Sequence, residues 1–279
     1  MGATSGSPVI RDSRFRAAVS AIQAGDLRSL KRVLDLHPEL LTQSAVEPDC
    51  YPRDYFRDPR LFWFVANNPM LVRTIPANIV DVAKALIARG VEQSDLDYTL
   101  ELVMSNGDTN AKRQAALIEL LADAGAKATP QAILVALAHG AHEPVQVLLA
   151  RGLPVTAPIA AGLGRDAELA PLLPEASPED RQAAFGIAVI NGQVAAARTC
   201  LEAGADANQL LPVHRHSTAL HQAAANDDVE MLKLLVEHGA RTDTHDTLWN
   251  GTPLGWAVHT RKAKAEAYLR SLEPPANAS

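Results

Sequence analysis

Apolar residues recur at helical spacing along most of this chain, in short segments that end at a glycine or at a tight polar turn. The clearest example covers residues 217–224, continues with a second segment at residues 228–235, and stops at Gly239. This spacing predicts a helix, a tight turn and a second helix. Thr218 has a hydroxyl suited to cap the first helix, and Gly239 is free to adopt the left-handed conformation that ends the second.

The same pattern returns about thirty residues later, where Gly251-Thr252-Pro253-Leu254-Gly255-Trp256-Ala257 restates the opening with a proline at the first helical position. Both stretches resemble the ankyrin repeat, which carries Thr-Pro-Leu-His-x-Ala-Ala in its first helix and Leu-Leu-x-x-Gly-Ala after its second. The resemblance covers nearly the whole chain and is specific from about Ala183 onward. It implies an all-α fold, an ankyrin-repeat solenoid of about eight stacked helix-turn-helix units with projecting finger loops.

The N-terminal and central repeats are degenerate. Residues 13–272 are predicted to form the repeat domain, between a disordered N-terminus at residues 1–12 and a polar, proline-rich, disordered tail at residues 273–279. Residues 41–60 fit no repeat and are predicted to form an irregular insertion. Residues 61–66 are then expected to supply the first helix of the next unit.

Aromatic residues concentrate in and just after this insertion: six of the twelve Phe, Trp and Tyr residues fall between positions 51 and 64. One interpretation is that they pack the insertion onto neighbouring helices, because aromatic rings bury large areas. The other is that they form a contact surface, because Tyr, Trp and Arg are enriched at interface hot spots. The residues proposed for that surface are Tyr51, Tyr55, Phe56, Arg57 and Trp63.

Histidines gather in the last two repeats. The resemblance places His214, His216, Asp246 and Trp249 on adjacent finger loops, and these four, with Trp256, are proposed as further partner-binding residues. Histidines near a carboxylate can hold a metal or supply a general base. The spacing matches no dedicated zinc pattern, so no metal is expected. The resemblance implies a structural role for His221, whose ring is expected to hydrogen-bond within and between repeats.

The net charge and the sequence motifs argue against several classes of function. A formal net charge of −6 and the lack of a Lys/Arg cluster argue against nucleic-acid binding. No secretory signal and no apolar run of membrane-spanning length is found, so no membrane association and a cytoplasmic location are expected. No nucleophile motif, phosphate-binding loop or paired-carboxylate arrangement stands out, so no catalytic residue and no cofactor are expected.

An extended solenoid surface favours protein recognition. The leading hypothesis is therefore a non-catalytic module that binds an unidentified protein partner through its concave face and finger loops. The irregular loops and standard C-terminal repeats also resemble the stand-alone bacterial ankyrin proteins. The alternative is a small-molecule-binding protein or an unusual enzyme, with a site in the concave groove near the C-terminal histidines. Convergent polar groups in a pocket favour the alternative, whereas a broad open groove favours a protein partner.

Overall fold

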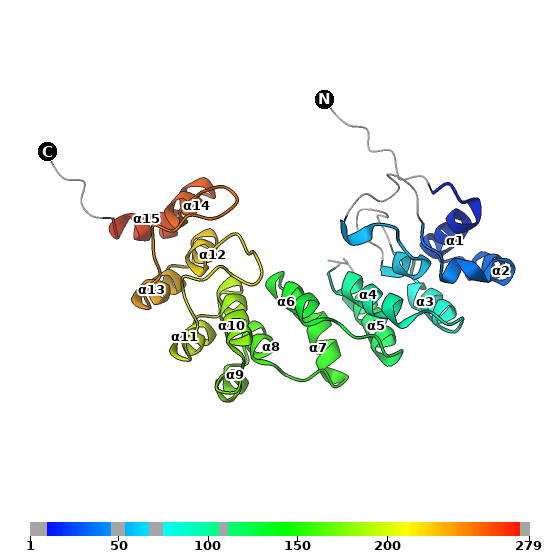
Figure 1. The fold of residues 1–279 in the computed structure, drawn as a ribbon, viewed down its shortest axis with the longest axis horizontal. Coiled ribbons are helices and arrows are strands. Elements are labelled where there is room, and N and C mark those ends of the chain that lie inside the picture. The colour runs from blue at the N-terminus through cyan, green and yellow to red at the C-terminus, as the bar shows by residue number, and fades with distance from the viewer. Residues whose placement is uncertain (1–9, 46–53, 67–74, 106–110, 274–279) are drawn as a thin grey trace, which may run out of the picture. The chain divides into compact units, whose positions relative to one another are not determined.

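The computed structural model describes residues 10–45, 54–66, 75–105 and 111–273, and within these ranges it is helical, without strands. The predicted all-α fold class is confirmed. The chain divides into two compact units: the first holds residues 1–133 and 143–153, and the second holds residues 134–142 and 154–279. In Figure 1 the first unit runs from blue to green and the second from green to red.

The first unit begins with two capped helices. The helices and turns of this unit are α1 (Ser13–Ala24), α2 (Leu27–Leu36), η1 (Pro38–Leu41), η2 (Asp54–Phe56), η3 (Leu61–Ala66), α3 (Ile79–Ile87), α4 (Gln93–Met104) and α5 (Ala111–Asp123). Asp12 starts α1 by accepting hydrogen bonds from the N–H groups of Arg14 and Phe15, at 2.8 and 3.3 Å. Gly25 ends α1 with φ of 68°, and a Cβ there would collide with Asn78. The tight turn between α1 and α2 therefore requires glycine.

Two sequence expectations change in this unit. The segment at residues 61–66, expected as an ordinary helix, is the 3-10 helix η3. Side chains three residues apart align in a 3-10 helix, so the buried pairs Leu61 with Phe64 and Phe62 with Val65 can face the core together. Residues 10–12, expected in the disordered N-terminus, belong to the described part, where Ile10 is buried.

The two ends of the expected insertion are joined. The N–H of Ala45 donates to the carbonyl of Pro59 at 2.9 Å, beside a single β-bridge between Ser44 and Arg60. Residues 46–53, which include Tyr51, lie outside the described residues, as do the terminal residues 1–9 and 274–279.

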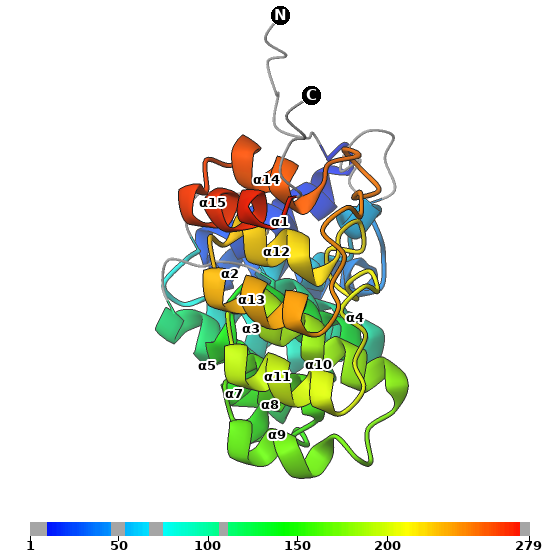
Figure 2. The same cartoon turned by 90° about the vertical axis from the view of Figure 1, so that its left-hand side faces the viewer.

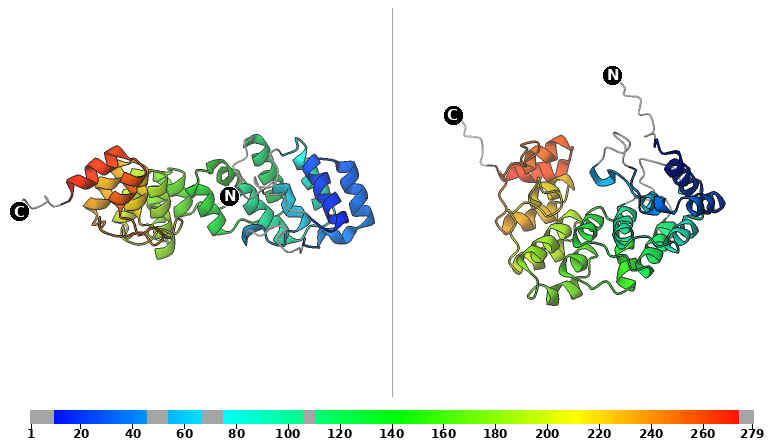
Figure 3. Two further views of the ribbon diagram at one scale, coloured as in Figure 1. Left: turned by 90° about the horizontal axis from the view of Figure 1, so that it is seen from above. Right: turned by 45° about the vertical axis from the view of Figure 1, so that its right-hand side comes forward.

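Eight further helices build the second unit, after α6 (Pro130–Ala138) and α7 (His142–Ala150), which cross the boundary between the units. They are α8 (Ala157–Gly162), α9 (Asp166–Leu172), α10 (Pro178–Ile190), α11 (Val194–Glu202), α12 (Ala219–Ala225), α13 (Val229–Glu237), α14 (Pro253–His259) and α15 (Ala263–Ser271). The first helix of each pair packs on the first helix of the next, in the series α8, α10, α12 and α14. The second helices form a parallel series, which Figures 2 and 3 show from further sides.

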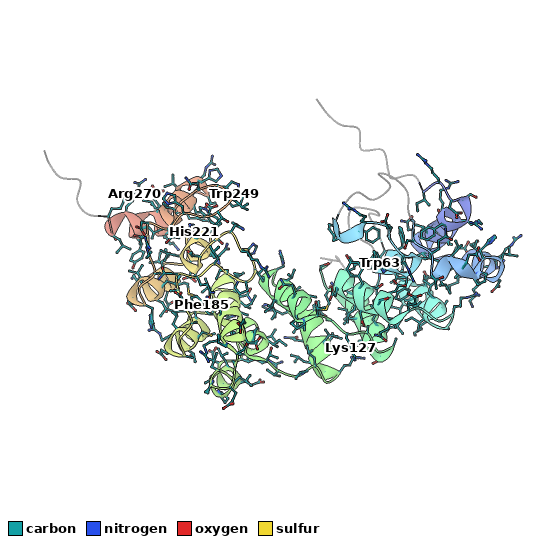
Figure 4. All side chains as sticks on the ribbon, viewed as in Figure 1. Trp63, Lys127, Phe185, His221, Trp249 and Arg270 are labelled. Atoms are coloured by element: carbon teal, nitrogen blue, oxygen red, sulfur yellow. The ribbon has the colours of Figure 1, made fainter. Side chains whose placement is uncertain are left out.

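Small residues allow this close stacking. The core of the second unit is rich in fully buried alanines, such as Ala160, Ala188 and Ala223, with Phe185 as its largest member (Figure 4). Cys200 is a free cysteine in the same core, and burial raises the pKa of its thiol to about 12. Its thiol is therefore protonated and unreactive at neutral pH. Across the described ranges, no helix is both long enough and apolar enough to cross a bilayer.

Candidate binding pocket

A buried carboxylate organises the loop between α13 and α14. Asp246 is only 3% exposed and accepts four hydrogen bonds. Its Oδ1 accepts from the N–H groups of Leu248 and Trp249, at 2.9 and 2.7 Å. Its Oδ2 accepts from the N–H of Gly251 at 2.7 Å and from Nε1 of Trp256 at 2.9 Å. The carboxylate thus closes the loop around itself and attaches it to α14.

The hydrogen bonds keep this carboxylate charged. Burial by itself raises the pKa of Asp246, but the donors on the Trp249 backbone, the Trp256 indole and the Gly251 backbone together outweigh it. The pKa of Asp246 therefore lies well below its ordinary value. Asp246 was predicted as a contact residue, but its burial gives it the role of holding the two tryptophans instead.

His221 connects α12 to the same loop. Its Nδ1 atom accepts hydrogen bonds from the N–H and the hydroxyl of Thr218, at 3.3 and 2.8 Å, and its Nε2 donates to the carbonyl of Gly251 at 3.0 Å. One accepting and one donating nitrogen make a neutral imidazole. Burial is the main cause that lowers the pKa of His221, which favours the same neutral form. The prediction that this ring bonds within and between repeats is confirmed.

A pocket of about 640 Å³ opens beside these anchors, within the second unit. The loop before α12, α12 itself, the loop before α14 and α14 all contribute to its lining, which consists of His214, His216, Gln222, Ala225, Trp249, Gly251, Gly255, Trp256, His259 and Thr260. Four of the residues predicted for partner binding are therefore brought together here. These four are His214, His216, Trp249 and Trp256.

Three rings form the wall of the pocket, and we refer to His216, Trp249 and Trp256 as the aromatic cluster. The ring centroids of His216 and Trp249 lie 5.1 Å apart at 85°, and those of Trp249 and Trp256 lie 5.6 Å apart at 62°. His216 stacks on Trp256 at 5.8 Å and 30°. Trp249 is 68% exposed, and Figure 4 shows it at the edge of the second unit. The cluster therefore combines rings in mutual contact with an accessible indole.

The lining of the pocket contains no Lys, Arg, Asp or Glu side chain. His214 packs against His139 and His216, with centroid distances of 6.0 and 6.1 Å. Burial, followed by the neighbouring charges of His139 and His216, lowers the pKa of His214, so its ring is neutral at neutral pH. Among the described residues, no group of three or more His, Cys, Asp or Glu side chains is placed to hold a metal ion.

The aromatic residues of the first unit mostly pack inside it. Phe56 is buried, with its ring 5.3 Å from that of Phe64 and 6.1 Å from that of Trp63. Trp63 is half-buried, its ring lies 4.4 Å from that of Tyr98 at an angle of 54°, and it donates its Nε1–H to Oδ1 of Asp95 at 3.0 Å. For these residues the structure favours the packing interpretation. Tyr55 remains 43% exposed and Arg57 is also exposed.

Asp95 was not singled out from the sequence. It is 2% exposed, and its Oδ2 lies 3.1 Å from Nη2 of Arg60. Burial raises the pKa of Asp95, although Arg60 and the Trp63 indole act in the opposite direction. Its local sequence gave no signal, because its partners on the insertion and η3 lie about thirty residues away.

Gln222 and Thr260 also line the pocket but were missed from the sequence. A signal was available for Gln222, because Gln222 lies four residues after Thr218 and Trp256 lies four residues after Thr252, the threonines that precede their helices. Ala225 and His259 each follow the same threonine by seven residues, so alignment of the two repeats places all four side chains on one helix face.

Comparison with known proteins gives a family for this region. Residues 185–274 match the family model described as ankyrin repeats in three copies, and this range includes every lining residue of the pocket. No curated protein matches the chain. The human ASB11 ankyrin repeat domain is 19% identical over 96% of this chain and 100% of its own, with a TM-score of 0.45. The ankyrin repeat domain of Bcl-3, a member of the IkappaB family, is 18% identical over 91% of this chain and 97% of its own, with a TM-score of 0.38.

Proposed function

Since the chain is an ankyrin repeat protein, matched by the family model over residues 185–274, we propose that it is a non-catalytic module that binds a protein partner through the pocket and finger loops of its second unit. Ankyrin repeats are in general protein-interaction modules, and stacked repeats offer an extended surface for this purpose. The proposed binding surface consists of the loops before α12 and α14. A cytoplasmic location stays a prediction.

The single observation that carries this proposal is the state of Trp249. Trp249 is 68% exposed although its backbone N–H is fixed to the buried carboxylate of Asp246. A large exposed indole on a fixed backbone buries much apolar surface when a partner covers it. Tryptophan is for this reason among the residues that dominate interface energetics.

Leu248 is 64% exposed beside Trp249 but lies outside the pocket lining, so it is not included in the proposed surface. Tyr55 and Arg57 in the first unit stay predicted contact residues. Phe56 and Trp63 are no longer proposed as contact residues, because they pack inside that unit.

Affinity capture from an extract of the native cells tests the proposal. The baits are the wild-type chain, Trp249→Ala, and Leu248→Ala as a matched control for an exposed apolar residue outside the pocket lining. We expect one protein to be retained by the wild type and by Leu248→Ala, and to be depleted at least about tenfold on Trp249→Ala, in line with a hot-spot truncation above about 1.4 kcal/mol.

Thermal melts of all three baits accompany the capture, so that a lost partner is compared only between folded proteins. Equal retention of every protein on the wild type and on Trp249→Ala would contradict the proposed surface. That result is also what the alternative predicts, in which the groove holds a small molecule. A Tyr55→Ala bait, run in parallel, tests the first unit separately.

A further inference from the structure

We propose that the pocket accepts an arginine side chain from an extended segment of the partner, with the guanidinium lying against the aromatic cluster. This inference rests on the proposed function and adds the chemistry of the group that enters the pocket. Three features of the pocket support it: the faces of its rings, the buried charge of Asp246, and a lining without Lys or Arg.

The faces of the rings are the first feature. Trp249 stands at 85° to His216 and 62° to Trp256, so two differently oriented walls meet around the same space. The face of an indole carries partial negative charge and attracts a cation within about 6 Å, and tryptophan is the strongest side chain for this interaction. A planar guanidinium can lie flat on one ring while its edge meets the other, and it is more weakly hydrated than an ammonium group.

The buried charge of Asp246 is the second feature. The carboxylate of Asp246 accepts the indole N–H of Trp256 at 2.9 Å, directly behind the wall of the pocket. This bond occupies the one hydrogen-bond donor of that indole, so the ring cannot use it to hold an anion. The carboxylate is charged, and its field adds to that of the ring face, so both favour a positive occupant.

The lack of Lys and Arg in the lining is the third feature. The lining has no Lys or Arg to repel a cation, and the ring of His214 is kept neutral by burial and by its histidine neighbours. The pocket volume of about 640 Å³ exceeds what one guanidinium needs. It therefore has room for the residues that flank an arginine in an extended segment, and the net charge of −6 favours approach of a basic segment.

A pair of peptides tests this inference. The probes are acetyl-Gly-Gly-Arg-Gly-Gly-amide and the same peptide with citrulline, which matches the shape of arginine but carries no charge. Binding is followed by tryptophan fluorescence and by chemical shifts of the indole N–H groups. We expect saturable binding of the arginine peptide, with an affinity at least about fivefold higher than that of the citrulline peptide, as a partly desolvated cation–π contact gives.

Two variants test whether the peptides bind at the aromatic cluster. Trp249→Leu should abolish the difference between the two peptides, whereas Leu248→Ala should keep it. Because Trp249 is exposed, its replacement leaves the buried contacts of Asp246 with Gly251 and Trp256 in place. Free N-acetyl-arginine amide, added as a third probe, should bind more weakly than the peptide if a chain segment is the natural occupant.

Each outcome decides a different point. Equal binding of the arginine and citrulline peptides, or no binding of either, overturns the assignment of a cation while the affinity capture still decides the proposed function. Equal binding of free N-acetyl-arginine amide and the peptide overturns the extended segment as the occupant. If the arginine preference survives in Trp249→Leu, the aromatic cluster is not the site.

Discussion

The indole Nε1 of Trp256 donates to Oδ2 of Asp246 at 2.9 Å, while Oδ1 of the same carboxylate holds the backbone N–H of Trp249 at 2.7 Å. One buried carboxylate therefore positions both tryptophans of the pocket, one through its side chain and the other through its backbone. A further link runs through Gly251, whose N–H donates to Asp246 and whose carbonyl accepts from His221. The pocket is thus held by hydrogen bonds that join two successive repeats.

Replacement of Asp246 by asparagine should lower the free energy of unfolding by roughly 2–3 kcal/mol, because charged acceptors form the stronger hydrogen bonds and an amide NH₂ would face N–H donors. Urea unfolding followed by tryptophan fluorescence measures the loss. Asp243→Asn is the control, since Asp243 is exposed on the same loop and its ion pair with Arg241 is exposed too. Equal shifts in the two variants would show that the Asp246 network contributes nothing special.

His221→Ala should lower the melting temperature, with a loss of roughly 1–3 kcal/mol, because Thr218 and Gly251 lose a buried hydrogen-bond partner. Differential scanning calorimetry checks this. His245→Ala serves as the control, because that histidine is exposed on the neighbouring loop. An unchanged melting temperature combined with lost ligand binding would reassign His221 from structure to recognition.

The stability of the wild type should fall as the pH drops from 7.5 to 5. Burial lowers the pKa of His221 in the folded state below its ordinary value of about 6.5, so the unfolded chain binds more protons between the two values. The stabilisation is fully present above about pH 6.5 and is lost as the pH falls toward the folded pKa. Urea midpoints at several pH values measure the slope, which should be smaller in His221→Ala. An identical slope in both proteins would exclude His221 as its source.

Gly162→Ala should destabilise the second unit by roughly 1–3 kcal/mol. A Cβ at this position would lie 2.8 Å from Cγ2 of Ile187 and 3.0 Å from Cδ2 of Leu137, so it would overpack the contact between α8 and its neighbours. Gly255→Ala is the matched control, because its Cβ would meet only Oγ1 of Thr252 at 3.4 Å. Alanine in the exposed helix α14 should be neutral or stabilising by up to about 1 kcal/mol. If both variants melt at a higher temperature than the wild type, or both at a lower one, the packing argument is wrong.

Much of the fold followed from the sequence because its signals are local. The helix starts at Thr218 and Thr252 and the helix end at Gly239 depend on a few adjacent residues, and the structure has each of them. The structural role of His221 was also predictable, because its partner Thr218 lies three residues away and the repeat fixes its second partner. The gathering of His214, His216, Trp249 and Trp256 in one pocket agrees with the expected neighbouring fingers.

Only the tertiary structure decided which of these side chains are available to a partner. Phe56 and Trp249 are both aromatic residues in irregular segments, yet one is 2% exposed and the other 68%. Phe56 has a wall of phenylalanine and tryptophan rings from η3 against which to pack, while Trp249 sits at the edge of its unit. Exposure depends on which surfaces arrive from distant parts of the chain, and no local pattern records that. The same reason applies to Asp246, whose charge and burial are compatible only because four donors converge on it once the loop has closed against α14.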